Sequence, residues 1–312
     1  MELNERADID TSQVDDRRGS GGGFGGGGFR GGGMPIPIPT GRGGIIGTII
    51  VIALMLLGGG IFGSNMVGGD GADTGDNTDI EKTCARDNPD RLKQVECRNA
   101  LFINSIQNYW QSALPQTMGK PYEQARTVFF SQAVSSGCGQ ADSGVGPFYC
   151  PADRQIYIDL TFWDLLASRF GARGEFAQPY VLAHEYGHHV QTLLGTEAQV
   201  RREQQRDPSN ANALSVRMEL QADCYSGAWA KNATQTTDAG GQPIFKSITQ
   251  DDINQALEAA AAVGDDAIQK KSGGPVNESE FTHGTSAQRQ EWFNRGFSSG
   301  DPKSCDTFGN AV

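Results

Sequence analysis

A long uncharged segment divides the chain and limits how it can fold. No residue from Gly43 to Gly69 carries a charge, and its centre, Ile45–Leu57, is rich in Ile, Leu and Val. About 20 apolar residues in a helix span the hydrocarbon core of a bilayer. We therefore predict one transmembrane helix over residues 44–64, which attaches the chain to a cell membrane as a single-pass protein.

Two other interpretations of this segment fit less well. A helix buried in a globular core would have globular sequence on both sides, whereas both flanks here are rich in glycine. A cleaved signal peptide begins with a short basic region, whereas some 43 residues precede this segment.

The basic residues near the segment predict its orientation. Arg30 and Arg42 precede it, and the first basic residue that follows it is Lys82. Basic residues accumulate on the cytoplasmic side of a membrane. We therefore expect the N-terminus in the cytoplasm and the larger C-terminal part outside it.

The composition on each side predicts the remaining organisation. Residues 1–43 include a glycine run from Gly19 to Gly33, so we expect a disordered Gly-rich cytoplasmic tail. A phosphate-binding loop would need a strand before the glycines and a helix after them. Residues 65–80 are rich in Gly, Asp and Thr and predict a flexible linker. Residues 81–312 remain as the folded domain.

The net charge restricts the partners. The chain has 312 residues and a formal net charge of −11. Nucleic-acid binding calls for a basic face, so no nucleic-acid partner is expected. The sequence does not indicate the oligomeric state.

The cysteines predict disulfides. All six lie in the part expected outside the cytoplasm, where an even number is typical of disulfide bonding. No C-x-x-C occurs, which argues against a cysteine zinc site. The simplest of the fifteen possible connectivities joins Cys84 to Cys97, Cys138 to Cys150 and Cys224 to Cys305.

Hydrophobic periodicity in the domain predicts an α+β fold, mostly helical, with a small β-sheet and no internal repeat. A polar segment rich in Glu, Gln and Arg after Gly195 is expected to be a loop. We predict helices over 98–114, 160–170, 212–231, 253–263 and 286–297, and strands over 126–130 and 155–160.

The most specific motif lies in a further predicted helix, Pro179–Leu194, which ends at Gly195. It contains H-E-x-x-H, in which His184 and His188 are four residues apart and share one face. Two imidazoles one turn apart can bind Zn²⁺, and Glu185 beside them can act as a general base. The same pattern also occurs by chance in helices without a metal, so a third ligand is needed.

The helix predicted over 212–231 offers that ligand. Glu219 and Asp223 are four residues apart and share a face that also carries Val216 and Gly227. A carboxylate on a packed face needs a partner, and two histidines with a glutamate form a known catalytic zinc site. Asp223 can then accept the remaining N–H of a ligand histidine. Alternatively, both residues are solvated side chains on a helix surface.

Two other histidines remain. His283 lies in a predicted loop before a helix, where it can stabilise an oxyanion, with Arg289 as a second cation; the alternative is an exposed loop histidine. His189 points about 100° around the helix from His188. We expect it to be structural.

Three segments together resemble a known family. Ala183–Gln191, Glu219–Cys224 and Thr282–Arg289 look like the bacterial putative neutral zinc metallopeptidases, which are membrane-anchored and zincin-like. The resemblance covers essentially the whole chain and shows no departure at the motif positions. A glutamate followed by an aspartate at the fourth position also resembles the glutamate zincins.

This resemblance implies a zincin-like metallopeptidase domain over residues 81–312 that binds Zn²⁺. It implies His184, His188 and Glu219 as metal ligands and Glu185 as the catalytic residue. By analogy with the wider group, Asp223 supports a ligand and His283 takes part in catalysis.

The predicted function is that of a membrane-anchored, zinc-dependent endopeptidase that hydrolyses a peptide or protein substrate with a metal-activated water. The strand over 155–160 is expected to be a sheet edge that holds the substrate in extended form. One alternative is a catalytically silent scaffold stabilised by zinc. Another is a zinc amidase that acts on cell-wall peptide.

Overall fold

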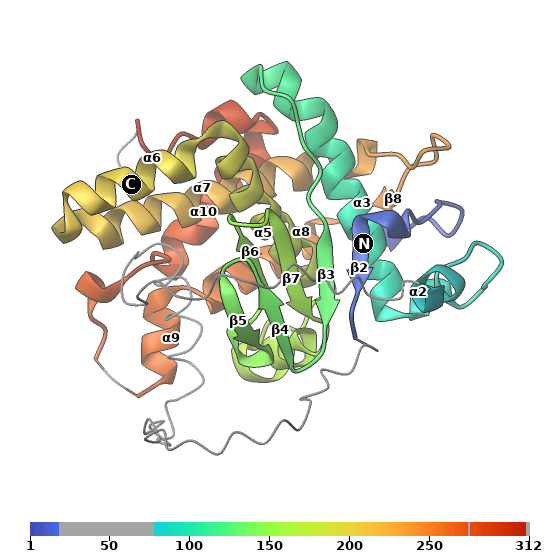
Figure 1. Ribbon diagram of the computed structural model, residues 1–312, viewed down its shortest axis with the longest axis horizontal. Coiled ribbons are helices and arrows are strands. Elements are labelled where there is room, and N and C mark those ends of the chain that lie inside the picture. The colour runs from blue at the N-terminus through green and yellow to red at the C-terminus, as the bar shows by residue number, and fades with distance from the viewer. Residues whose placement is uncertain (19–77, 274, 310–312) are drawn as a thin grey trace, which may run out of the picture.

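The computed structural model describes residues 1–18, 78–273 and 275–309 (Figure 1). The predicted transmembrane helix over 44–64 and most of the predicted linker over 65–80 lie outside these residues. Within the described part of the chain, no helix combines the length and the apolar character needed to cross a membrane.

A four-stranded sheet forms one layer of the domain. Three of its strands run parallel, and the fourth runs antiparallel at one edge. Residues predicted as two strands, 126–130 and 155–160, form β3 and β7, so both predictions are confirmed. The order across the sheet is β2 (Val14–Asp16), β3 (Thr127–Phe130), β7 (Gln155–Asp159) and β6 (Phe148–Cys150).

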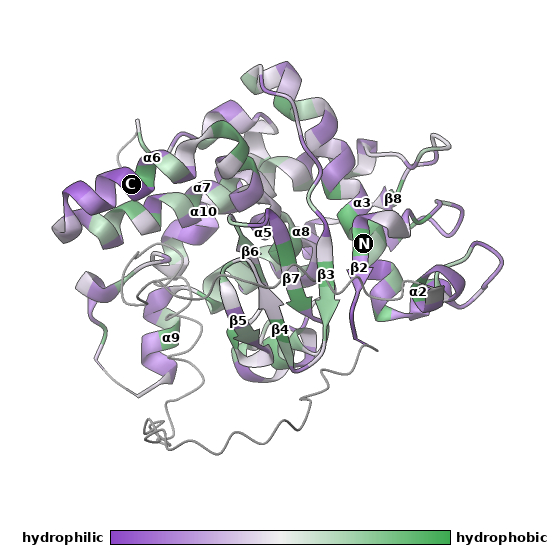
Figure 2. Cartoon of the chain, in the orientation of Figure 1, coloured by the Kyte–Doolittle hydropathy of each residue, from purple (hydrophilic) through white to green (hydrophobic). Residues whose placement is uncertain are grey.

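Helices supply most of the domain, as the periodicity predicts. Figure 2 shows hydrophobic residues along β3 and β7, while the outlying α6 is largely hydrophilic. The long helices are α3 (Val95–Ala113), α5 (Ala177–Leu194), α7 (Ala211–Asn232), α8 (Gln250–Ala262) and α10 (Ser286–Ser299). The shorter elements are α2 (Thr78–Thr83), α4 (Phe162–Leu165), α6 (Thr196–Arg206), α9 (Asp265–Lys271), the pair β1 (Glu2–Leu3) and β8 (Phe245–Ser247), and the hairpin β4 (Ala133–Ser136) and β5 (Gly139–Asp142).

Local sequence signals fix several helix ends. A capping box of Thr249 with Asp252 begins α8, and Thr285 with Gln288 begins α10 in the same way. Gly195 ends α5 with a φ of +81°, a conformation that favours glycine. These terminal residues therefore determine where α8 and α10 begin and where α5 ends.

Two glycines allow α7 and α10 to pack almost backbone to backbone. A Cβ atom at Gly227 would lie 2.1 Å from the carbonyl oxygen of Phe293, and one at Gly296 would lie 1.9 Å from that of Cys224. No larger residue fits at either position without movement of a helix.

All three predicted disulfides are present. They join Cys84 to Cys97, Cys138 to Cys150 and Cys224 to Cys305. The third bond ties α7 to the C-terminal segment across a sequence separation of 81 residues.

The prediction of a disordered tail is wrong for residues 1–18. Strand β2 pairs with β3, with Val14 opposite Thr127, and the side chain of Val14 is fully buried. The Arg91 guanidinium donates to the carbonyls of Glu5 and Ala7, each at 2.7 Å. Backbone pairing and these polar contacts order a segment that has few apolar side chains of its own.

This pairing also affects the predicted topology. Two hydrogen-bonded strands lie on the same side of any membrane, so residues 1–18 and the domain share one compartment. The expected arrangement, with a cytoplasmic N-terminus and an extracytoplasmic domain joined by one crossing, would place β2 and β3 on opposite sides of the membrane, and it stays a prediction.

The polar segment after Gly195 is helix α6, not a loop. Arg201 and Glu197 form an ion pair at 2.6 Å, four residues apart on the helix. Val200 is buried, and the Gln204 amide donates to the Ser215 hydroxyl of α7 at 3.0 Å. Contacts with α7 therefore stabilise a helix whose sequence is almost entirely polar.

The expected substrate-binding edge is also misplaced. The predicted strand over 155–160 is β7, which lies between β3 and β6 inside the sheet. The edge beside it is β6, a short strand that the periodicity does not reveal.

Candidate metal centre

A glycine in the motif helix brings the two metal-binding helices together. A Cβ atom at Gly187 would lie 3.0 Å from the Cα atom of Ala222. Because glycine has no Cβ atom, α5 can approach α7 closely at this point. This close approach lets Glu219 of α7 reach the histidines of α5.

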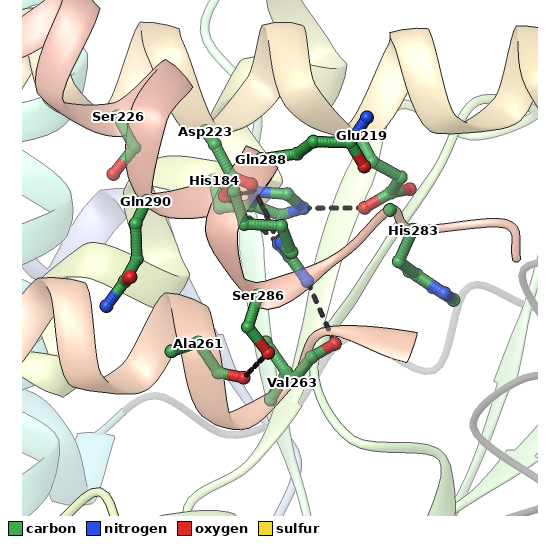
Figure 3. Close-up of polar contacts among 12 residues, drawn as sticks. His184, Glu219, Asp223, Ser226, Ala261, Val263, His283, Ser286, Gln288 and Gln290 are labelled. Carbon is green, nitrogen blue, oxygen red and sulfur yellow. Dashed lines mark hydrogen bonds and ion pairs between the residues drawn. The ribbon is translucent and has the colours of Figure 1, made fainter. Parts of the chain in front are cut away.

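Three predicted ligand residues converge in a buried site. Nε2 of His184 lies 3.1 Å from Glu219 Oε2 and 3.2 Å from Nε2 of His188. Nε2 of His188 lies 3.4 Å from Glu219 Oε1. Tetrahedral zinc with bonds of 2.0–2.1 Å separates its ligand atoms by about 3.3 Å. The three side chains therefore have the spacing of a zinc site, and Figure 3 shows the contact between His184 and Glu219.

The neighbours of the histidines fix their tautomers. Nδ1 of His184 lies 2.9 Å from a carboxylate oxygen of Asp223, which only accepts, so the proton is on Nδ1. Nδ1 of His188 lies 2.9 Å from Oε1 of Gln191, whose amide nitrogen is occupied by donation to the Met218 carbonyl. In their neutral forms, both histidines therefore direct the lone pair of Nε2 into the site.

This arrangement fits a metal ion. Two nitrogen lone pairs and the Glu219 carboxylate face one another with no proton between them in these tautomers. A cation at their centre, either a metal ion or the proton that the raised pKa of His184 favours, offsets the repulsion between these electron pairs. The donor set of two nitrogens and one carboxylate suits zinc and leaves one coordination position open.

Asp223 has the position predicted for it. It accepts from His184, from the Tyr180 hydroxyl at 2.7 Å, and from Nε of Arg289 at 2.7 Å. Burial raises the pKa of Asp223, but the positive charges of Arg289 and His184 outweigh burial and lower it to about 2. The carboxylate thus stays ionised and orients His184.

Arg289 does not have the role expected of it. Its guanidinium is 3% exposed, is paired with Asp223, and donates to the Val263 carbonyl. We expected a second cation for an oxyanion. Arg289 instead balances the buried charge of Asp223.

The electrostatic environment favours positive charge at the site. Burial lowers the pKa of His184, but the adjacent carboxylates of Asp223 and Glu219 outweigh it and raise the pKa to about 10. Burial raises the pKa of Glu219, and the three histidines around it, His188, His283 and His184, bring it well below its usual value. The site therefore has a net attraction for a cation.

Glu185 lies beside this centre. It is buried and lines the same pocket as the ligands and Tyr149 of β6. Burial raises its pKa to about 7, with the Glu219 charge adding to the shift and His184 opposing it. A carboxylate poised near neutral pH is suited to proton transfer.

His283 lines the pocket but is not one of the three converging ligand residues. Its Nδ1 lies 3.2 Å from Asp265 Oδ1, and Asp265 Oδ2 accepts from the backbone N–H groups of Thr282, His283 and Gly284. Burial lowers the pKa of His283, but the carboxylates of Glu219 and Asp265 outweigh it and raise the pKa.

Two residues of the site are absent from the sequence-based prediction. Gln191 could have been found, because it lies three residues after His188 on the same helix and a ligand histidine needs an acceptor for its second nitrogen. Asp265 gave no such signal, because only the fold brings it to His283.

His189 agrees with the structural role expected of it. It is fully buried, and its Nε2 lies 2.6 Å from the Glu123 carbonyl. Its Nδ1 lies 3.2 Å from the Tyr149 hydroxyl. The residue therefore links α5 to β6 rather than to the metal centre.

Comparisons with known proteins agree with this geometry. Residues 2–308 match the family described as putative neutral zinc metallopeptidase. The chain is 40% identical over 304 residues to the uncharacterized protein YpfJ of Escherichia coli (strain K12), covering 97% of this chain and 98% of that one. It is 45% identical over 228 residues to the uncharacterized protein Rv2575 of Mycobacterium tuberculosis (strain H37Rv), covering 72% and 75%. No solved structure matches, so the zincin-like fold stays a prediction. The chain belongs to the putative neutral zinc metallopeptidase family, and that family implies Zn²⁺ as its metal.

Proposed function

We propose that this protein is a zinc-dependent endopeptidase. The observation that carries the proposal is the meeting of three ligand side chains, whose nitrogen and oxygen atoms lie 3.1 to 3.4 Å apart, beside the buried carboxylate of Glu185. Zinc bound at such a site lowers the pKa of a water molecule and polarises a carbonyl group.

The side chains of the pocket supply the proton transfers. Glu185 accepts a proton from the water that attacks the peptide carbonyl and later donates it to the leaving amine. His283, held by Asp265, presents an imidazole that can donate a hydrogen bond to the carbonyl oxygen and stabilise the negative charge developing there.

The substrate backbone is proposed to bind at β6. This strand ends the four-stranded sheet, and both Phe148 and Tyr149 line the pocket. An extended peptide can add to such an edge through backbone hydrogen bonds. Because Glu185 lines the same pocket as Tyr149, a peptide on β6 lies close to the general base.

We also propose that the domain works outside the cytoplasm. Three disulfides support this location, because disulfides persist mainly in oxidising compartments. Membrane attachment through residues 44–64 stays a prediction. If that attachment holds, the β2–β3 pair requires the N-terminal residues to be on the same side as the domain.

The test is metal analysis and protease profiling of the purified full chain. We expect one zinc per chain, cleavage of internal peptide bonds in a peptide library, loss of cleavage with a chelator, and recovery with zinc. Bound zinc without any cleavage would support a scaffold instead. Release of amines from cell-wall material alone would indicate an amidase.

A further inference from the structure

The pocket at the metal centre runs along α5. Val181 lies three residues before His184 and on the same face, and it lines the pocket. Glu197, just beyond the end of α5, lines the pocket too and is paired with Arg201. At 1.5 Å per residue along a helix, the metal ligands lie between these two residues.

Val181 is one of five apolar side chains from five segments that line the pocket, and we call this set its apolar end. Its other walls come from α4, from the turn that follows α4, from the residue after α8, and from α9. All the side chains belong to one hydrophobic cluster, and none has a hydrogen-bonding group. They are Val181, Phe162, Phe170, Val263 and Ile268.

The elements that form this end also hold the catalytic groups in place. Val263 accepts a hydrogen bond from Arg289, and Ile268 lies on α9 with Asp265, which holds His283. The apolar end is therefore adjacent to the reacting groups rather than at a distant site. A side chain bound there belongs to a residue next to the bond that is cleaved.

The size and polarity of this space favour a large apolar side chain of the substrate over a charged one. The whole pocket has a volume of about 180 Å³, and an apolar cavity of about 150 Å³ is enough to bind benzene. A charged side chain that entered would lose its hydration without gaining a partner. A large apolar side chain would gain about 25 cal/mol for each Å² buried.

We propose that this apolar end is the specificity site, and that the substrate is a polypeptide with Leu, Met or Phe next to the scissile bond. The proposal rests on the proposed peptidase function and adds to it the class of side chain recognised. A difference of one methylene group in a hydrophobic pocket changes kcat/KM by about 10- to 200-fold. We therefore expect Leu or Phe to be preferred over Ala by at least about tenfold.

The test uses the zinc-loaded full chain and peptides that differ only in the residues flanking one bond. Cleavage sites are mapped by mass spectrometry. Val181→Glu places a charge in the apolar end and is expected to reduce cleavage of the Leu and Phe peptides at least about tenfold. Val276→Glu is the matched control, because Val276 is 39% exposed and does not line the pocket. The control should cleave like the unaltered protein.

Binding keeps this test separate from the test of hydrolysis. Fluorescence anisotropy with the zinc-loaded Glu185→Gln variant measures peptide affinity without turnover. Tighter binding of Leu and Phe peptides, weakened at least about tenfold by adding Val181→Glu, supports the apolar site even if the unaltered protein cleaves nothing. Equal binding of apolar, charged and Ala peptides overturns the proposal, and so does cleavage without an apolar preference.

Discussion

Single residues around the ligands decide whether the site can hold zinc. Asp223 and Gln191 each keep a proton on Nδ1 of one histidine and so leave Nε2 available for the metal. His184, His188 and Glu219 could be predicted from the sequence because all three lie on helices that hydrophobic periodicity reveals. The two histidines lie on α5, and Glu219 lies on α7. Asp265 could not, since its contact with His283 depends on how α9 packs.

Removal of the Gln191 amide should weaken zinc binding. In Gln191→Ala, Nδ1 of His188 loses its acceptor, and loss of such a partner typically lowers metal affinity 10- to 100-fold. Competition with a fluorescent zinc chelator measures the change. Gln205→Ala, an exposed glutamine on α6, is the control. Equal zinc affinity in the two variants would show that Gln191 does not orient the ligand.

Pairs of elements account for most of the stability of the site. Periodicity predicts α5, α7 and α10 because their apolar faces repeat along the helix. It does not predict α6, which is polar and depends on contacts with α7, or β6, which has only three residues. Short or polar elements are stabilised by neighbours that are distant in sequence, and local patterns do not record such neighbours.

The contact between α7 and α10 predicts that a glycine-to-alanine substitution changes the free energy of unfolding in the direction opposite to the usual one. Glycine to alanine inside a helix ordinarily stabilises by about 1 kcal/mol. Gly296→Ala should instead lower the free energy of unfolding by about 3 kcal/mol or more, because the new Cβ atom meets the carbonyl of Cys224. Urea unfolding measures the change, with the exposed Ser298→Ala of the same helix as control. A stabilised Gly296→Ala variant would contradict the close packing.

The end of β7 gives a pH-dependent prediction. Burial raises the pKa of Asp159, but hydrogen bonds from Ser143, Thr161 and Gln132 outweigh burial and lower it below the usual 3.8. The unfolded chain therefore binds a proton more readily than the folded one. The stabilisation is complete above pH 3.8 and is lost as the pH falls below it.

Asp159→Asn removes this ionisation and tests it. The variant should be less stable at pH 7 by about 1–3 kcal/mol. The difference from the unaltered protein should shrink when urea unfolding is repeated at pH 3. A difference that stays constant between the two pH values would rule out the ionised Asp159 as its source.

At the scale of the whole molecule, the N-terminal residues belong to the folded domain. Composition predicted a disordered tail because residues 1–43 are rich in glycine, but that average concealed a segment that pairs with β3. Pairing between distant segments leaves no local signal. The predicted single-crossing topology rests on the same expectation of a separate tail and stays a prediction.

Labelling in intact cells tests the shared compartment. All six cysteines are in disulfides, so an added cysteine is the only reactive thiol. A membrane-impermeant maleimide should label Ser12→Cys and Glu258→Cys alike, since both positions are exposed and lie on one domain. Labelling of only one of them would show that β2 and the domain are on opposite sides of a membrane.

The most direct test of the metallopeptidase assignment is zinc content and peptide cleavage measured together in Glu185→Gln. The amide cannot accept the proton from water, but Glu185 is not among the three converging ligand residues. We predict one zinc per chain, as in the unaltered protein, and cleavage reduced by about 10²- to 10⁴-fold. Glu258→Gln, an exposed glutamate on α8, should retain full cleavage. Undiminished cleavage by the zinc-loaded Glu185→Gln variant would contradict the account.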